Sequence, residues 1–449
     1  MKYLVLTALV IIFSGFSGSY VYSDDISLSV YNDDLAIVKI SDVMSFEKGI
    51  QTITFTNVSK RVDPTSVRFS SVNGGINVLE QNFRYDLVNS QKVLERYIDK
   101  KITIWVKDGE LIEGVLMSVA GDVVVNDNGG NIKIVKLNSI ERFEFPELPE
   151  GLVTKPTLFW KLRSERKVET AAEVSYMTAG FDWHAEYTAV IDESEKKMEV
   201  SSWVSIDNNS GATYDNAKLK LIAGDVNRIK PEVQYKRMPS TMAMQQEDAA
   251  GSFEERGLFE YHLYELQGRT TVNNAEIKQI SLFPNTAVKA EKLLIYDPRK
   301  NPTRVTANIE FTNSERDGLG MPLPAGIVRV YKSDTDGAVE FIGEDAIKHT
   351  PKNEKVRLAL GTSFDITAER KVADSNRISR SIIEESIEII FRNRKEETVS
   401  ITAVEHFWRD WDIINKSDDF VKKDAFTAEF TVEIPAGSEK IISYTVRHR

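Results

Sequence analysis

Few side chains in this sequence are suited to catalysis or metal binding. The chain has five histidines and no cysteine. His184 and Glu186 are two residues apart in an alternating segment, so both side chains would lie on one face of a β-strand. A zinc or calcium site there would need a ligand from a distant segment, such as Glu344, Asp345 or His349. That site would support a metal-dependent hydrolase. Scattered histidines in β proteins are more often structural, however, so we predict neither a metal nor a cofactor.

Motifs for other reactions are missing from the sequence. Without cysteine, the chain has no thiol nucleophile, no thiolate metal site and no disulfide. It contains no G-x-S-x-G element, and Gly361-Thr362-Ser363 precedes a predicted strand rather than a helix. Gly129-Gly130 fits a hairpin turn and not a phosphate-binding loop. We therefore assign no catalytic residues.

An aromatic and charged segment near the C-terminus is suited to binding. Trp408 and Trp411 are three residues apart, and Arg409 lies between them. Exposed Trp beside Arg is a common way to hold a sugar or a partner protein. Large aromatic side chains are mostly buried, so packing of one or both rings at the edge of a sandwich is the alternative. The binding hypothesis makes Trp408, Arg409 and Trp411 a recognition surface, together with the loop predicted below.

The first 23 residues have the layout of a secretory signal peptide. Lys2 is followed by an apolar run from Tyr3 to Phe13, and then by a stretch rich in small residues, Ser14–Ser19, that ends at Val21-Tyr22-Ser23. The apolar run is about half of the ~20 residues that a membrane span needs. We predict cleavage after Ser23 and an exported product, periplasmic or extracellular, with no stable membrane anchor after cleavage.

The charge composition of the chain argues against some classes of binding partner. The 449 residues include 57 Lys and Arg against 68 Asp and Glu, a net charge of −11. An acidic surface repels phosphate backbones and anionic lipid heads, which argues against nucleic acid and general membrane binding. A chain of this length should divide into two or three domains.

The mature chain has the pattern of a mainly β protein built from several antiparallel sandwiches. Its apolar segments are short, alternate in polarity and are separated by Gly, Asn, Asp and Pro. Residues 24–84 are predicted to form an N-terminal sandwich. Residues 85–145 show one helical period followed by five short strands with tight turns. That order is typical of a small SH3-like or Sm-like barrel, here interpreted as a structural insert.

The rest of the chain is predicted to be a larger β-sandwich region. A proline-rich linker at residues 145–151 marks the expected boundary. The first part covers residues 150–226 and the remainder covers residues 259–449. Between them, residues 227–258 lose the strand pattern and gain Pro, Met and acidic residues, so we predict a mobile loop.

Several blocks in residues 150–449 resemble a bacterial exported family known only as domain of unknown function four-one-three-nine. The blocks occur in the family's order and are Ser175–Tyr187, Trp203–Gly211, Asn216–Val226, Leu258–Tyr264, Gly318–Gly326, Phe341–Glu344, His349–Pro351 and Gly361–Ile366. The resemblance implies an exported β-rich protein without an established activity. It carries no catalytic residue over to this chain.

These observations favour a non-catalytic function. We expect an exported binding, scaffolding or assembly protein of the cell envelope or extracellular space, acting through sheet edges and loops. Its partner would be a protein or polysaccharide of the envelope. The alternative is a metal-dependent hydrolase acting on envelope polymer or polypeptide, with His184, Glu186 and His349 as its candidate residues.

Overall fold

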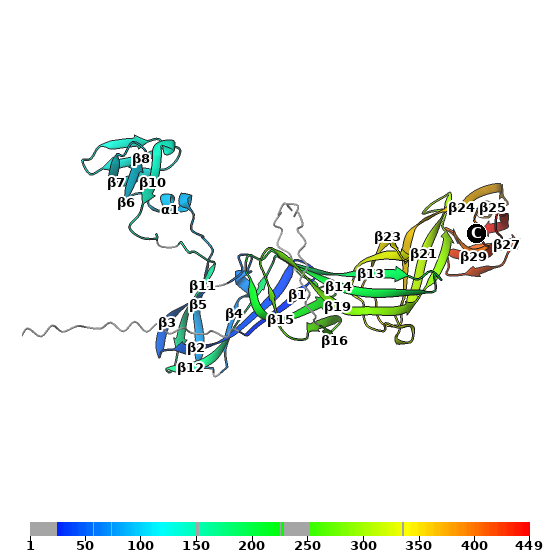
Figure 1. Ribbon diagram of the computed structural model, residues 1–449, viewed down its shortest axis with the longest axis horizontal. Helices are drawn as coiled ribbons and strands as arrows, with labels where there is room; N and C mark the ends of the chain where they lie inside the picture. Colours follow the sequence, from blue (N-terminus) through cyan, green and yellow to red (C-terminus); the bar gives the residue numbers. More distant parts are fainter. Residues whose placement is uncertain are drawn as a thin grey trace, which may run out of the picture. The chain divides into compact units, whose positions relative to one another are not determined.

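The computed structural model describes residues 25–56, 58–72, 74–149, 152–224, 226–228, 252–334 and 336–449. This part of the chain is mainly β, as predicted, and has a single α-helix (Figure 1). None of its helices has the length and apolar character needed to cross a membrane. The predicted signal peptide, residues 1–23, lies outside the described residues.

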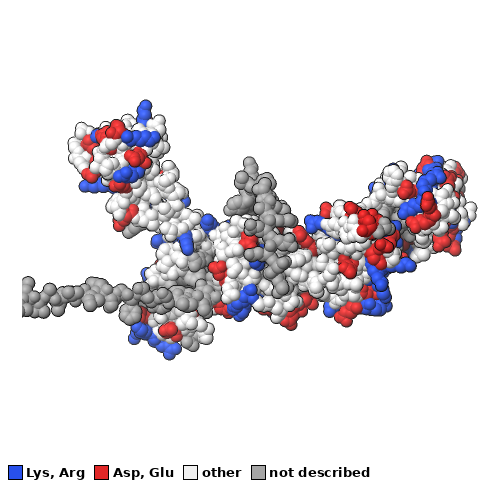
Figure 2. All heavy atoms as spheres, in the orientation of Figure 1, with Lys and Arg blue, Asp and Glu red and all other residues white. Residues whose placement is uncertain are grey.

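Contacts divide the chain into two compact units. The N-terminal unit contains Val38–Val58 and Pro64–Tyr176, with the described residues up to Ser27. The C-terminal unit contains Leu28–Ile37, Ser59–Asp63 and Met177–Arg449. The first two strands therefore contribute residues to both units. Acidic and basic side chains are interspersed on the displayed faces of both units (Figure 2).

The N-terminal unit contains a sandwich of two layers, one formed by the last three strands of an eight-stranded sheet and the other by a three-stranded sheet. One layer has the order β2–β12–β4, from Leu35–Phe46, Val168–Thr178 and Arg68–Ser71. The other has the order β3–β11–β5, from Gly49–Phe55, Thr157–Ser164 and Ile76–Arg84. Trp160 of β11 is fully buried, and its ring lies 5.5 Å from that of Phe69 in β4. This contact joins the two layers.

The domain boundary differs from the one predicted at residues 145–151. Strands β5 and β11 precede and follow the small barrel in sequence, yet they are neighbours in one sheet. The barrel is therefore inserted into the N-terminal sandwich. Strands β11 and β12, which we placed in the second region at residues 150–226, complete that sandwich, because Pro146 and Pro149 only mark the exit from the insert.

The small barrel has the predicted order of one helix and five strands. Helix α1, Ser90–Arg96, begins after Asn89, whose side chain accepts a hydrogen bond from the Lys92 N–H. The sheet order is β10–β6–β7–β8–β9, and alternating Ile, Val and Leu side chains form its core. The bounds are Lys101–Val106 for β6, Leu111–Ser118 for β7, Val123–Asp127 for β8, Ile132–Val135 for β9 and Ile140–Glu144 for β10, with a short 3₁₀ turn at Leu137–Ser139.

The C-terminal unit begins with two packed sheets. One contains β16–β17–β15–β1, from Phe253–Leu258, Tyr261–Leu266, Tyr214–Ala223 and Asp25–Tyr31, and β18, Thr270–Val272, also pairs with β15. The other has the order β19–β14–β13–β22–β23, from Glu276–Lys289, Lys197–Asn208, Phe181–Ile191, Gly326–Ser333 and Val339–Ile347. Trp183 of β13 bridges them, since its Nε1–H donates to the carbonyl of Ile222 at 3.3 Å.

Nine further strands form the last sheet, with the order β27–β30–β25–β24–β21–β20–β26–β29–β28. Their bounds are Trp411–Lys416, Glu439–His448, Ile383–Asn393, Lys355–Arg377, Arg304–Thr312, Glu291–Tyr296, Val399–His406, Thr427–Ile434 and Phe420–Lys422. Two strand pairs, β13–β22 and β20–β26, are parallel, whereas the sequence analysis predicted antiparallel sandwiches. Inward residues from several of these strands share one apolar core.

A buried asparagine recurs where strands of the C-terminal unit end. Asn208, Asn313 and Asn393 are all fully buried. Each side-chain amide donates to carbonyls of the following loop and of a neighbouring segment; Asn393, for example, bonds Glu397 and Ile434. These asparagines donate hydrogen bonds to backbone carbonyls that have no partner in a neighbouring strand. The bonds fix the geometry of the loops.

The predicted mobile loop at residues 227–258 is corrected at its C-terminal end. Phe253–Leu258 forms strand β16, which pairs antiparallel with β17 along its full length. Glu254, Glu255 and Arg256 interrupt the alternation of apolar and polar residues, so the sequence did not predict a strand here. Backbone hydrogen bonds to β17 stabilise the strand instead. Residues 229–251 of the predicted loop lie outside the described residues.

Candidate recognition surface

Trp408 is exposed on a short loop that is held at both ends. The loop, residues 407–410, connects β26 to β27. At its start, the Phe407 N–H donates to the carbonyl of Phe426 at 2.7 Å; at its end, the carbonyl of Asp410 accepts from the Arg449 N–H at 2.9 Å. Phe407 is buried and packs on Trp411, with ring centroids 4.4 Å apart. Trp408 remains 57% exposed on this fixed backbone.

Two groups hold the indole ring of Trp408. The guanidinium of Arg409 lies 4.1 Å from the ring centroid, a cation–π contact. The imidazole of His448, at the end of β30, stacks on the same indole at 5.5 Å. An aromatic side chain that is ordered before binding loses little entropy when a partner arrives. We define Trp408 and Arg409 as the candidate recognition surface.

His448 is a buried base beneath this surface. Its side chain is 3% exposed, and its Nε2 lies 3.7 Å from a carboxylate oxygen of Glu385. Its Nδ1 has no hydrogen-bond partner within the described part of the chain. Burial lowers the pKa of His448; Glu385 opposes this shift, and Arg409 adds to it. The imidazole therefore resists protonation in the folded state.

This lowered pKa predicts a loss of stability in mild acid. The unfolded chain binds a proton at His448 with a pKa near the ordinary value of 6.5, above that of the folded chain. The free energy of unfolding should therefore fall as pH drops through about 6.5 and towards the folded pKa, and this group should contribute almost no slope more than about one pH unit above 6.5. Urea unfolding of the protein and of His448→Gln across pH 5–8 measures the difference. An identical pH slope for the two proteins would contradict the prediction.

Trp411 does not belong to the recognition surface, which corrects the sequence analysis. It is 3% exposed, and its Nε1–H donates to the carbonyl of Ala425 at 2.8 Å. Phe407 and Phe420 pack against its ring. Spacing alone could not separate the two tryptophans. Trp408 lies in the loop, whereas Trp411 begins β27 with its side chain toward the core.

The three candidate metal ligands are not brought together as a site. His184 and Glu186 do share a face of β13, and the His184 Nε2 lies 3.3 Å from a carboxylate oxygen of Glu186. The other oxygen of Glu186 accepts from Gln279 Nε2 at 3.2 Å and lies 3.7 Å from Arg329. His349 accepts instead from the Ala325 N–H at 3.1 Å. No group of three potential metal ligands occurs among the residues that the structure describes.

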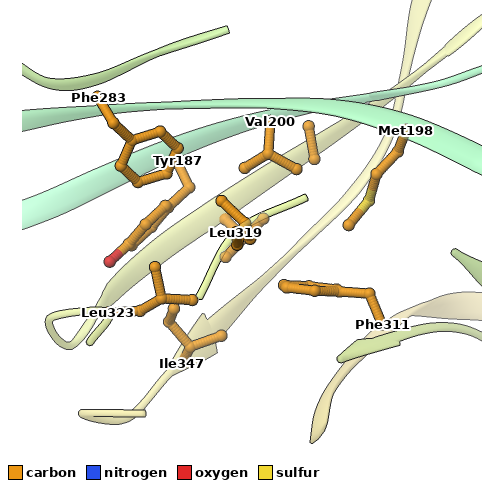
Figure 3. A pocket seen from close by; sticks show the side chains of 10 residues that line it. Tyr187, Met198, Val200, Phe283, Phe311, Leu319, Leu323 and Ile347 are labelled. Atoms are coloured by element: carbon orange, nitrogen blue, oxygen red, sulfur yellow. The ribbon is translucent and has the colours of Figure 1, made fainter. Parts of the chain in front are cut away.

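A small apolar cavity lies inside the C-terminal unit, between the β13–β14 face and the loop after β21 (Figure 3). Tyr187, Met198, Phe283, Phe311, Leu319 and Leu323 are among its lining residues. Its volume is about 10 Å³, which is at the lower limit for a single water molecule, and every lining side chain is apolar or aromatic. It is a packing void rather than a ligand site.

A buried charged cluster in the nine-stranded sheet was missed by the sequence analysis. Glu405 of β26 is 1% exposed. Arg370 Nε of β24 donates to its two carboxylate oxygens at 3.1 and 3.0 Å, and the Tyr444 hydroxyl also donates to it. Burial, followed by the Glu405 carboxylate, raises the pKa of Tyr296 to about 12. A signal was present, because Glu405 follows Val399, Ile401 and Ala403 in the inward phase of β26.

Comparisons of this sequence with models of protein families and with curated proteins find no match. The family resemblance described above therefore stays a prediction.

Proposed function

We propose that this chain is an exported, non-catalytic binding or scaffolding protein of the cell envelope or extracellular space. The signal-peptide pattern of residues 1–23 and the resemblance to an exported family support this location. The observation that carries the binding function is the exposed Trp408, held on a fixed loop beside Arg409. Trp and Arg are the residue types that most often dominate binding energy at protein interfaces.

A protein partner fits this surface better than a polysaccharide. Sugar rings stack on an open aromatic face, but Arg409 and His448 both lie against the indole of Trp408. The exposed part of the indole and the guanidinium donors suit an apolar pocket with a carboxylate or carbonyl at its rim. An envelope polysaccharide remains the alternative partner, and the experiment below distinguishes the two.

Crosslinking of the tagged protein in its native cells tests this proposal. We expect Trp408→Ala to reduce recovery of the specific partner by about 10-fold or more, the typical effect of removing a central aromatic anchor. Arg409→Ala should reduce it less. Phe364→Ala is the matched control, since Phe364 is an aromatic residue of the sheet that carries the Trp408 loop and is 87% exposed. Equal recovery of the partner with Trp408→Ala and Phe364→Ala would overturn the proposal. Capture of a glycan instead of a protein would show that the partner is a polysaccharide.

A further inference from the structure

Strand β9 is an unprotected edge of the small barrel. Among the described residues it pairs only with β8, and it ends the sheet order β10–β6–β7–β8–β9. Ile132 and Ile134 of β9 are 65% and 70% exposed, and both precede Val135, which points into the core. Leu137, just after the strand, is 54% exposed. Exposed aliphatic side chains on an open edge mark a pairing site.

The open hydrogen-bonding groups of β9 belong to the two exposed isoleucines. At the β8–β9 turn, the Asp127 N–H donates to the carbonyl of Asn131 at 2.9 Å. Alternation along an antiparallel ladder then directs the backbone groups of Lys133 toward Val125 of β8. The N–H and C=O of Ile132 and Ile134 consequently point away from the sheet. Backbone groups and apolar side chains at this edge therefore come from the same two residues.

The opposite edge of the barrel is protected. On β10, Arg142 pairs with Glu144 at 2.9 Å, and its guanidinium lies 4.3 Å from the ring centroid of Trp105. Charged side chains of this kind are a common device against edge-to-edge association. Strand β9 has one charge, Lys133, and Glu110 pairs with it at 2.9 Å. The two edges of the barrel therefore differ. The charged edge strand β10 is not a suitable apolar partner for Ile132 and Ile134.

We propose that β9 is a self-association site that pairs antiparallel with β9 of a second copy of this chain. A two-fold axis through Lys133 places Ile132 opposite Ile134 of the second copy, and Ile134 opposite its Ile132. Each such pair can exchange both backbone hydrogen bonds, and it covers the exposed aliphatic side chains. The two Lys133 side chains meet at the axis, where each carries its own Glu110. The interface is isologous and closes as a dimer.

A second copy is the occupant that the edge itself favours. The edge is complementary to itself, because its apolar positions are related by the two-fold axis and its single charge is already neutralised. An acidic or basic peptide would find no unpaired opposite charge on the strand. This inference is independent of the proposed recognition surface, which lies in the C-terminal unit.

Sedimentation velocity of the purified protein, up to about 100 µM because a small interface is weak, measures the association. We expect a monomer–dimer equilibrium whose dissociation constant rises by about 100-fold or more in the double variant Ile132→Glu/Ile134→Glu, since both apolar pairs are lost and like charges face each other. Val78→Glu/Leu79→Glu is the matched control, because these residues are also exposed on an edge strand, β5. A monomer at every concentration, larger open assemblies, or a dimer that survives the isoleucine variant would overturn the proposal.

The absence of cysteine allows a second test that does not weaken the apolar contacts. In Lys133→Cys, the two thiols would face each other across the axis at a separation that a disulfide can bridge. Mild oxidation should yield a covalent dimer. Glu113→Cys, an exposed position on β7 of the same barrel, is the control and should stay monomeric on a reducing-agent-free gel. Equal crosslinking of both variants would contradict the pairing, even if the protein is dimeric.

Discussion

Arg370→Met should lower the free energy of unfolding of the C-terminal unit by about 3–5 kcal/mol, the cost of leaving one partner of a buried ion pair alone. The carboxylate of Glu405 is almost fully buried, and Arg370 is its only cationic hydrogen-bond donor in the described chain. The hydroxyl of Tyr444 also donates to Glu405, but a neutral donor cannot compensate the charge. The expected loss is therefore that of an uncompensated buried charge.

Two further variants separate this effect from lost packing. The double variant Arg370→Met/Glu405→Leu should be more stable than Arg370→Met, because it removes the stranded carboxylate. Arg392→Met is the matched control: Arg392 pairs with Glu439 and Glu369 near the surface, and its loss should cost less than about 1 kcal/mol. Hydrogen exchange of peptides from β24 to β30 locates and measures the change. A loss below 1 kcal/mol in Arg370→Met would mean that water solvates Glu405.

Trp411→Ala should destabilise the protein by about 3–5 kcal/mol, whereas Trp408→Ala should cost less than about 1 kcal/mol. Trp411 packs between Phe407 and Phe420, and its removal leaves a cavity and an unpaired carbonyl at Ala425. Trp408 is 57% exposed, and its truncation removes ring contacts with Arg409 and His448. The contrast tests the assignment of one ring to the core and the other to the surface.

Thermal unfolding of the two single variants measures this contrast directly. The Trp408→Ala protein serves as the matched control, because the same side chain is truncated three residues away. Near-equal melting temperatures for the two variants would contradict the assignment of Trp411 to the core and Trp408 to the surface. If the Trp411→Ala protein is as stable as the unmodified protein, Trp411 should be assigned to the recognition surface and not to the core.

Local pattern predicted much of the barrel and of the strands. In β26, Val399, Ile401 and Ala403 alternate with polar residues, and all three are buried as the alternation predicts. The same alternation places Glu405 in the core, although glutamate is mostly an exposed residue type. In the barrel, the helix, the tight turns and the five strands follow from residues that are close in sequence.

Pairing between distant strands could not be read from the pattern. Strands β5 and β11 are separated in sequence by the whole barrel, so the proline-rich segment between barrel and β11 had the composition of a domain linker. Similarly, Trp408 and His448 meet only because β30 pairs with β27, the strand that follows the Trp408 loop. The residues next to Trp408 and His448 in the sequence give no indication that these two side chains are in contact.

The sequence by itself determined the mainly β class, the helix and five strands of the barrel, and the shared face of His184 and Glu186 on one strand. These properties follow from side-chain alternation and turn chemistry, which act over a few residues. Only the tertiary structure decided which tryptophan is exposed, that His184, Glu186 and His349 form no common site, and which barrel edge is open. Those properties depend on strand order and register, which are set by contacts between residues far apart in the chain.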